Sequence, residues 1–204
     1  AVESYPTGVT ELRAVFEEFQ TLNPDLFVGG GHFNDAVLFI RTAAAAGFCP
    51  KAFLITVGPS SPAFVEDLGE QAVYVWGATQ WQPSMQWRDP WFGSAADFAA
   101  RYQVRYGDTP TYEVAESTAA ALVLHLAVEA AGTTDTEAVR RALSALDMTT
   151  FYGPIRFDGS GKNVAKPMAT VQVQPDRTIR VIAPPAAAEA DPIWPAPACA
   201  GTNE

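Results

Sequence analysis

The sequence predicts an α/β fold in three layers, in which helices flank a parallel sheet and an antiparallel hairpin follows near the C-terminus. Three observations predict this fold. Residues 1–78 alternate short apolar runs with segments whose apolar residues recur at helical spacing, and residues 94–146 carry helical patterns alone. Alternation of apolar and polar residues then returns over residues 153–182. With 204 residues, 48% of them hydrophobic, the chain can bury a substantial core.

The first predicted elements are a short strand and an amphipathic helix. Residues 1–5 are expected to form an edge strand, and Thr10 with Glu11 is expected to open the helix. Asn23-Pro24 would end it, because the residue before a proline avoids the helical region. The helix has one predicted apolar face, formed by Leu12, Val15, Phe16, Phe19 and Leu22.

A buried strand, a glycine turn and a second helix are expected next. The strand covers residues 25–28, and Gly29-Gly30-Gly31 allows the backbone to turn without a Cβ penalty. Asn34 is expected to be the N-cap of the helix, with Asp35 in its first turn. Gly47 stands where a left-handed residue would end the helix.

The loop between this strand and this helix is a candidate ligand site, because ligands of open parallel sheets bind beyond the carboxyl ends of strands. His32, Phe33 and Asn34 lie in the loop. The glycine turn lacks the third glycine of a dinucleotide fingerprint, and no Gly-Lys-Ser/Thr of a P-loop follows it. The residues alone leave two alternatives open for His32, a pocket residue or a solvated loop histidine.

Two further strands complete the predicted parallel sheet. They cover residues 52–57 and 72–76, and Gly58-Pro59 ends the first of them. Ser60 or Ser61 is expected to cap a short helix between the two strands. The alternation of strand and helix predicts right-handed βαβ connections.

Residues 79–92 form a stretch without a clear period that is rich in aromatic residues, including Trp81, Trp87 and Trp91. Long loops of this kind often form a binding surface. The alternative is that the rings only cover the edge of a core.

Three helices are expected to follow. One covers residues 94–106, a long alanine-rich helix covers residues 112–131, and Thr134 or Asp135 caps the third. His125 and Glu129 interrupt the apolar run of the long helix, so we expect no segment that spans a bilayer.

The C-terminal part predicts β-structure and a tail. Strands are expected at residues 153–158, 168–174 and 178–182, as an antiparallel addition to the sheet. Residues 184–204 are rich in Ala, Pro and acidic residues, so we expect an extended tail.

Charge and cysteine content limit the possible partners. The net charge of −10 would repel a polyanion, so we expect no nucleic-acid partner. The chain starts at Ala1 without Met or a basic segment, which favours a processed or cut chain. Cys49 and Cys199 could pair, which would stabilise the fold by about 4–5 kcal/mol in the chain-entropy model, or both could be free thiols.

No recognisable catalytic or metal-binding pattern is present. The sequence has no HExxH, CxxC or Cys/His cluster, so we expect no metal and no cofactor. Gly58-Pro59-Ser60-Ser61-Pro62 fails the nucleophile-elbow pattern at its last position. An α/β enzyme that uses the His32 loop is an alternative without support from a motif.

The ordered motifs resemble those of type I periplasmic solute-binding proteins, in the branched-chain amino acid and amide group that supplies ABC transporters. The resemblance covers nearly the whole chain except the tail. It depends on the following motifs: Tyr5-Pro6-x-Gly8, Asn23-Pro24-Asp25, Gly30-Gly31-His32-Phe33, Val57-Gly58-Pro59, Pro62-Ala63-Phe64, Leu68-Gly69, Trp81-x-Pro83, Phe151-Tyr152-Gly153-Pro154-Ile155-x-Phe157-Asp158 and Gly161.

The resemblance implies that this chain is the C-terminal portion of a two-lobed protein. Residues 1–78 and 151–183 would belong to the second lobe, and residues 184–204 would be the tail. Residues 79–150 would be a crossover and helices that pack on the missing N-terminal lobe. The second lobe's first strand and helix would also precede Ala1. Because those helices would then expose apolar faces, we expect a homodimer, a domain swap or an unusual packing of this segment.

The resemblance also implies which residues face the solute. His32 and Phe33 match a position where the family places an aromatic ring, with Asn34 beside it. Thr56-Val57-Gly58 matches the loop where amino-acid binders place an acid to hold the α-ammonium group, and no acid is present there. Trp81, Tyr112 and Glu113 fall near the crossover and the start of the long helix. Glu113 could supply the missing negative charge or could only stabilise the helix dipole.

The implied function is non-enzymatic binding of a small amino acid, amide or aromatic solute between two lobes that close by a hinge. The implied partner is an ABC transporter permease. The implied location is extracytoplasmic, either periplasmic or lipid-anchored at the surface of a Gram-positive cell. A ligand-sensing regulatory domain of the same fold is the alternative.

Overall fold

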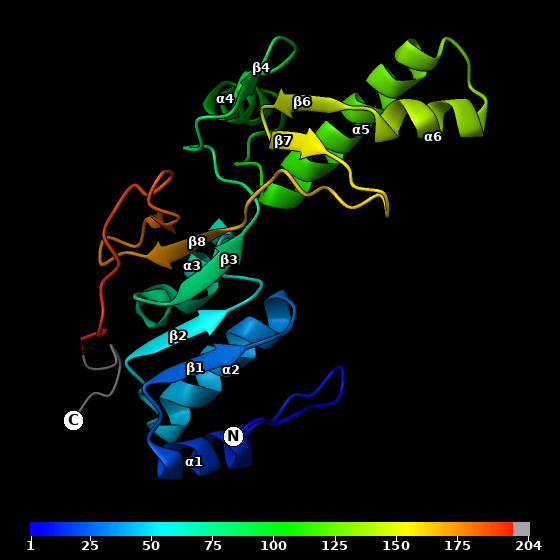
Figure 1. The fold of residues 1–204 in the computed structure, drawn as a ribbon. Coiled ribbons are helices and arrows are strands. Elements are labelled where there is room, and N and C mark those ends of the chain that lie inside the picture. Colours follow the sequence, from blue (N-terminus) through cyan, green and yellow to red (C-terminus); the bar gives the residue numbers. More distant parts are fainter. Residues whose placement is uncertain (198–204) are drawn as a thin grey trace. The chain divides into compact units, whose positions relative to one another are not determined.

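The computed structural model describes residues 1–197 and divides the chain into two compact units (Figure 1). The first unit consists of residues 1–79 and the C-terminal residues from 169 onward, and the second consists of residues 80–168. Cys199 lies outside the described residues, so its pairing with Cys49 stays a prediction.

The first unit contains a five-stranded mixed sheet in the order β1-β2-β3-β8-β9. The parallel strands are β1 (Leu26–Gly29), β2 (Ala52–Ile55) and β3 (Trp76–Thr79). The antiparallel strands β8 (Ala169–Val173) and β9 (Ile179–Ala183) extend the sheet beyond β3. The predicted parallel sheet with an antiparallel C-terminal hairpin is therefore confirmed.

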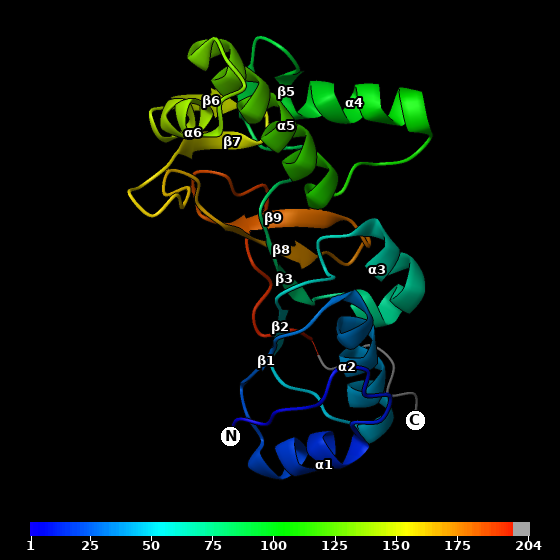
Figure 2. The same cartoon turned by 90° about the vertical axis from the view of Figure 1, so that its right-hand side faces the viewer.

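Three α-helices accompany this sheet: α1 (Arg13–Leu22), α2 (Phe33–Ala46) and α3 (Pro62–Leu68). A 3₁₀ turn over Gly69–Ala72 follows α3. Helices α2 and α3 lie on one side of the sheet (Figure 2). As predicted, α2 ends at Gly47, whose φ of 68° is in the left-handed region that favours glycine.

The main core of the first unit is a cluster of aromatic rings between the sheet and the helices. Phe27 of β1 lies 5.2 Å from Phe16 of α1 and 5.7 Å from Phe39 of α2, measured between ring centroids. All three side chains are buried. Burial of one such ring contributes about 1.5–3 kcal/mol, so the cluster fixes the helices against the sheet.

The opposite face of the sheet is covered unevenly. Strand register places Val28, Leu54, Trp76 and Gln172 in one row across the four strands from β1 to β8, and hence on one face. The Gln172 amide group exchanges hydrogen bonds with the backbone of Ile193, and the rings of Trp76 and Trp194 lie 6.1 Å apart. At the other end of the row, Val28 is 59% exposed.

Several predicted elements of the first unit differ in the structure, among them the first helix, which begins at Arg13 with Leu12 as its N-cap instead of at Thr10. Residues 1–5 form no strand, because no neighbouring strand pairs with them among the described residues. The third strand begins at Trp76 instead of Ala72. The reason is local: Tyr74 has a φ of +69°, and its N–H donates to the Val173 carbonyl at 2.8 Å, so the chain turns before it becomes extended.

The second unit contains three helices and two short hairpins. The helices are α4 (Ala95–Tyr106), α5 (Tyr112–Ala131) and α6 (Thr136–Ser144). The hairpins pair β4 (Arg88–Asp89) with β5 (Gly93–Ser94), and β6 (Asp147–Thr150) with β7 (Gly153–Arg156).

Two predicted caps of these helices are confirmed. The Ser94 hydroxyl accepts a hydrogen bond from the Asp97 N–H at 3.1 Å, and the Asp97 carboxylate accepts one from the Ser94 N–H at 2.8 Å. At the start of α6, the Asp135 carboxylate accepts a hydrogen bond from the Ala138 N–H at 2.9 Å.

The boundary expected at residue 151 falls after Met168 instead. The expectation that the strand near residues 153–158 extends the main sheet is wrong, because β7 pairs only with β6. Phe151 packs inside the second unit, with its ring stacked on Phe98 at 4.1 Å. Its N–H also donates to the buried carboxylate of Asp89 at 2.7 Å, so this turn is held by side chains that precede it by about sixty residues.

Helix α5 is apolar on most of its circumference. By length and composition it could cross a membrane, with a mean hydropathy of 1.4 over an 18-residue window, so the expectation drawn from His125 and Glu129 does not hold by these two measures. The same measures also select core helices of soluble proteins. Its buried side is formed by Ala115, Ala119, Leu122, Val123 and Ala127, while Leu124 is 51% exposed.

Candidate functional site

The carboxyl ends of β1 and β2 bring two of the predicted loops together. The strands are parallel neighbours, with Gly29 opposite Ile55, so the loops that follow them leave the same edge of the sheet. One loop carries His32, Phe33 and Asn34, and the other carries Thr56, Val57 and Gly58. Six of the nine predicted ligand-binding residues therefore lie at one edge of the first unit.

His32 occupies the N-cap of α2, the position predicted for Asn34. Its backbone N–H donates to the Asp35 carboxylate at 2.8 Å, which fixes the start of the helix. The His32 side chain is exposed, while Phe33 is half-buried and packs against the aromatic core. His32 and Asn34 are therefore open to solvent at this edge, and Phe33 contributes mainly to the core.

The Thr56 hydroxyl connects the two loops. It accepts a hydrogen bond from the Gly31 N–H at 3.3 Å and donates one to the Gly31 carbonyl at 3.4 Å. The Thr56 N–H also donates to the Gly29 carbonyl at 3.0 Å. These contacts hold the glycine turn against β2 and fix the place where the His32 side chain emerges.

Two glycines in these loops are required by close packing. A Cβ on Gly31 would contact the Tyr5 hydroxyl and would lie 2.7 Å from the Cβ of Asp35. Gly58 has a φ of +120°, and a Cβ there would lie 2.8 Å from Ala36. The loops therefore approach α2 as closely as the backbone allows.

The edge has little negative charge to offer a solute. The second loop contains no Asp or Glu between Thr56 and Ser61. The nearest carboxylate, Asp35, already accepts a hydrogen bond from His32 and lies against Tyr5, whose pKa is raised by burial and by this negative charge. A buried ammonium group without a carboxylate partner is costly, so this edge alone is poorly suited to hold one.

The remaining three predicted residues lie in the second unit. Trp81 is only 1% exposed, and its Nε1–H donates to the Phe151 carbonyl at 3.1 Å. Its ring packs edge-to-face on Phe98, so Trp81 belongs to the core and does not line an open surface in this structure. The alternative reading of the aromatic stretch, that its rings cover a core, is therefore the one that the structure supports for Trp81.

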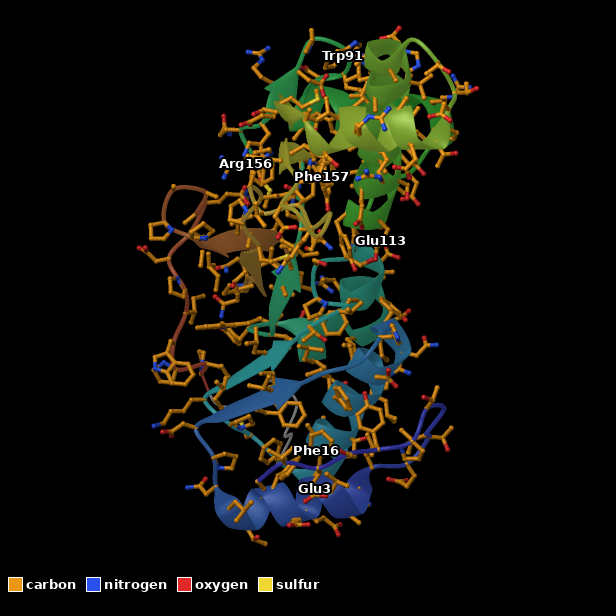
Figure 3. The ribbon with its side chains drawn as sticks, turned by 45° about the vertical axis from the view of Figure 1, so that its right-hand side comes forward. Glu3, Phe16, Trp91, Glu113, Arg156 and Phe157 are labelled. Atoms are coloured by element: carbon orange, nitrogen blue, oxygen red, sulfur yellow. The ribbon has the colours of Figure 1, made fainter. Side chains whose placement is uncertain are left out.

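Tyr112 and Glu113 occupy the first turn of α5, and Figure 3 labels Glu113. Tyr112 is half-buried against the same aromatic core, and Glu113 is exposed. Burial raises the pKa of the Tyr112 phenol, and the carboxylate of Glu113 raises it further. Glu113 is thus an exposed acid beside the Tyr112 hydroxyl in the first turn of a helix, where the helix dipole also stabilises negative charge.

No sequence pattern pointed to a half-buried lysine in the second unit. The Lys166 ammonium group lies 4.1 Å from the centre of the Tyr152 ring and 5.1 Å from that of Trp87, and it donates to the Gln80 carbonyl. The Tyr152 hydroxyl donates to Gln80 Oε1 at 2.7 Å. Burial lowers the pKa of Lys166 to about 8, while Glu116 opposes the shift. The Lys166 ammonium group therefore has its partners within the second unit.

The edge of the first unit provides groups suited to recognition of a small solute. Among residues 1–197, no group of three or more His, Cys, Asp or Glu side chains is placed to hold a metal ion. The edge of the first unit offers an imidazole, an amide and backbone groups, which suit hydrogen bonding to a small solute.

Comparison with known proteins gives the class of protein that the sequence motifs resemble. A family model described as periplasmic binding protein matches residues 1–178. A curated relative from Brucella abortus (strain 2308), named Leu/Ile/Val-binding protein homolog 7, is 26% identical over 190 residues and aligns with 88% of this chain and 46% of its own length.

Solved structures of amino-acid-binding proteins have a similar fold over a similar share of this chain. The crystal structure of a leucine-binding protein, LivK, from Thermotoga maritima MSB8 has a TM-score of 0.76 at 23% identity, over 88% of this chain and 49% of that protein. A leucine-, isoleucine-, valine-, threonine- and alanine-binding protein from Brucella ovis has a TM-score of 0.72 at 18% identity, over 87% and 45%. The chain thus spans about half the length of the relatives it matches, and it belongs to the periplasmic binding protein family.

Proposed function

We propose that this chain is the C-terminal part of an extracytoplasmic solute-binding protein that delivers a small solute to an ABC transporter permease. The observation that supports this most strongly is the family match over residues 1–178, together with the paired loops at the carboxyl edge of β1 and β2. The protein would act by lobe closure on the solute and not by chemistry. Its proposed location is either the periplasm or, with a lipid anchor, the surface of a Gram-positive cell.

The proposed solute belongs to the class of small amino acids, amides and aromatic acids. Relatives of this chain are named as binders of leucine, isoleucine and valine. The second loop lacks an acid, so the first unit favours a solute whose polar group is an amide or a carboxylate over one held by its ammonium group. If the solute is a free amino acid, Glu113 is the candidate for its ammonium partner.

The test is isothermal titration calorimetry on the full-length protein with a panel of aliphatic amino acids, amides and aromatic acids. We expect at least one member to bind, and His32→Ala to weaken its binding by about tenfold or more, as expected for loss of one good contact. His125→Ala is a matched control, because it removes the other histidine of the chain, which lies exposed on α5.

Two outcomes would contradict the proposal. One is a full-length protein that binds no member of the panel. The other is an equal loss of affinity in both histidine variants. The 204-residue chain alone should bind more weakly than the full-length protein, because the first unit supplies only one set of contacts.

A further inference from the structure

Strand β9 is an end strand of the five-stranded sheet. It covers Ile179–Ala183, and its β-branched residues suit a pleated strand. The ladder pairs it with β8 on one side, so the backbone N–H and C=O groups on its other side are not used by the sheet. Such groups are a template for another strand unless something else occupies them.

Glu189 occupies these groups at Val181, the middle residue of the strand. The Glu189 N–H donates to the Val181 carbonyl at 2.7 Å, and one oxygen of the Glu189 carboxylate accepts from the Val181 N–H at 2.9 Å. The other carboxylate oxygen lies 3.6 Å from the Arg180 guanidinium. Glu189 therefore pairs with Val181 as a residue of a neighbouring strand would, but its side chain takes the place of the backbone carbonyl. A ladder does not continue past such a contact.

The chain reaches this position by turning back directly after β9. Pro184 and Pro185 follow the strand, and the Ala187 N–H donates to the Pro184 carbonyl at 2.9 Å. A proline has no N–H to donate to a ladder, so these two residues also prevent the strand from being extended.

The tail strap, residues 184–197, then crosses the face of the sheet opposite α2 and α3 (Figure 2). The Ile193 backbone exchanges hydrogen bonds with the amide group of Gln172, a fully buried residue of β8. Further on, the Ala196 N–H donates to the Lys51 carbonyl at 2.8 Å, next to the start of β2. The tail strap is thus fastened at β9, at β8 and beside β2, and its loss would take from the buried Gln172 amide its contacts with Ile193.

We infer that the tail strap guards the β9 edge against pairing with a second copy of this chain. Two copies of the strand would pair antiparallel about Val181, because a two-fold interface joins the same surface of both partners. Glu189 prevents this pairing, since it occupies both backbone groups of Val181 and places a carboxylate where the second strand's carbonyl would lie. Charged side chains protect edge strands in this way. The β9 edge becomes an interaction surface for a second copy only when the tail strap is released.

Hydrogen exchange at single-amide resolution tests the inference on the 204-residue chain. A Leu124→Glu background places a charge on the exposed part of α5 and so limits association through that helix. At low protein concentration, we expect Glu189→Ala to speed exchange of the Val181 amide at least about tenfold, because this N–H loses a charged acceptor.

Asp191→Ala is the matched control, since it removes another exposed acid of the tail strap and should leave exchange of the Val181 amide unchanged. Unchanged exchange of this amide in Glu189→Ala would overturn the inference. An equal increase in both variants would do the same.

Sedimentation velocity provides a second readout in the same background. We expect dimers from a chain that ends at Ala183, and from Gln172→Leu combined with Glu189→Ala, which releases the tail strap at β8 and β9. Protection of the Val181 amide should return as the concentration of either variant rises, which distinguishes edge pairing from association through another surface. The double variant retains all 204 residues, so it decides the outcome if the shortened chain does not fold. A double variant that stays monomeric at every concentration would overturn the inference, as would dimers in which the Val181 amide still exchanges fast.

Discussion

Gly31 shows how single residues fix the candidate site. The glycine lies in contact with both Tyr5 and Asp35, and the Thr56 hydroxyl bonds to its backbone on both sides. This position therefore sets how closely the His32 loop approaches α2. Lys166 is a second example, since this half-buried lysine places its ammonium group against two aromatic rings.

We expect Gly31→Ala to destabilise the chain by about 1–3 kcal/mol, because the added Cβ overlaps neighbouring atoms in a packed site. Gly30→Ala is the matched control, since a Cβ there has no atom within 4 Å. Urea unfolding of the two variants measures the difference. Equal urea midpoints for the two variants would show that the packing around Gly31 accommodates the added Cβ without loss of stability.

The lowered pKa of Lys166 predicts that the stability of the chain changes with pH. Its folded pKa of about 8 lies below the ordinary value of 10.5, so between these values the unfolded chain binds more protons and this group makes stability rise with pH. Below pH 8 the ammonium is charged in both states, and the cost of its burial is fully present.

We therefore expect the stability advantage of Lys166→Met over the wild type to shrink between pH 7.5 and 9.5, by about 1 kcal/mol or less after solvent screening. Lys162→Met, at an exposed position of the same unit, should show no such change. Urea unfolding at both pH values checks this. A constant difference for Lys166→Met would mean that burial does not perturb this lysine.

At the scale of elements, one buried carboxylate connects the two short hairpins of the second unit. The buried Asp89 carboxylate accepts hydrogen bonds from the N–H groups of Trp91, Phe92 and Phe151, at 2.9, 2.6 and 2.7 Å. It thereby ties the β4–β5 hairpin to the turn between β6 and β7. In the first unit the corresponding role belongs to the loops after β1 and β2, which Thr56 joins.

Asp89→Ala should destabilise the chain by about 2–4 kcal/mol, because the buried N–H group of Phe151 and the part-buried N–H groups of Trp91 and Phe92 lose a charged acceptor. Asp176→Ala provides the comparison: Asp176 is exposed and accepts a hydrogen bond from the Thr178 N–H at 3.0 Å, so its loss should cost less than about 1 kcal/mol. Thermal unfolding distinguishes the two variants. Similar losses of stability in both variants would show that the Asp89 carboxylate stabilises the chain no more than an exposed one.

At the scale of the whole molecule, one helix exposes a large apolar surface. Helix α5 is apolar on most sides, and its window of highest hydropathy is only 28% buried. The chain spans about half the length of the relatives it matches, and under the proposed function a further lobe would cover this surface. Self-association is the expected consequence.

Sedimentation velocity of the 204-residue chain at rising concentration should show reversible association, and Leu124→Glu should weaken it, because a charge on an apolar contact is costly to bury. Val164→Glu is the control, as Val164 is similarly exposed, at 49% against 51%, but lies outside α5. A wild-type chain that stays monomeric at all concentrations would contradict the prediction.

The sequence by itself determined the local elements and the family. Apolar periodicity and glycine positions predicted the strand–turn–helix order of the first unit. Residue type predicted the cap at Ser94 and narrowed the cap of α6 to Thr134 or Asp135, because these features depend on neighbours in the chain. Only the tertiary structure decided which strands pair and which rings are buried. Trp81 became a core residue through Phe98 and Phe151, residues 1–5 remained unpaired beside an open groove, and Lys166 met Gln80 across 86 positions of sequence. Such contacts depend on partners far apart in the chain, so no local pattern could have specified them.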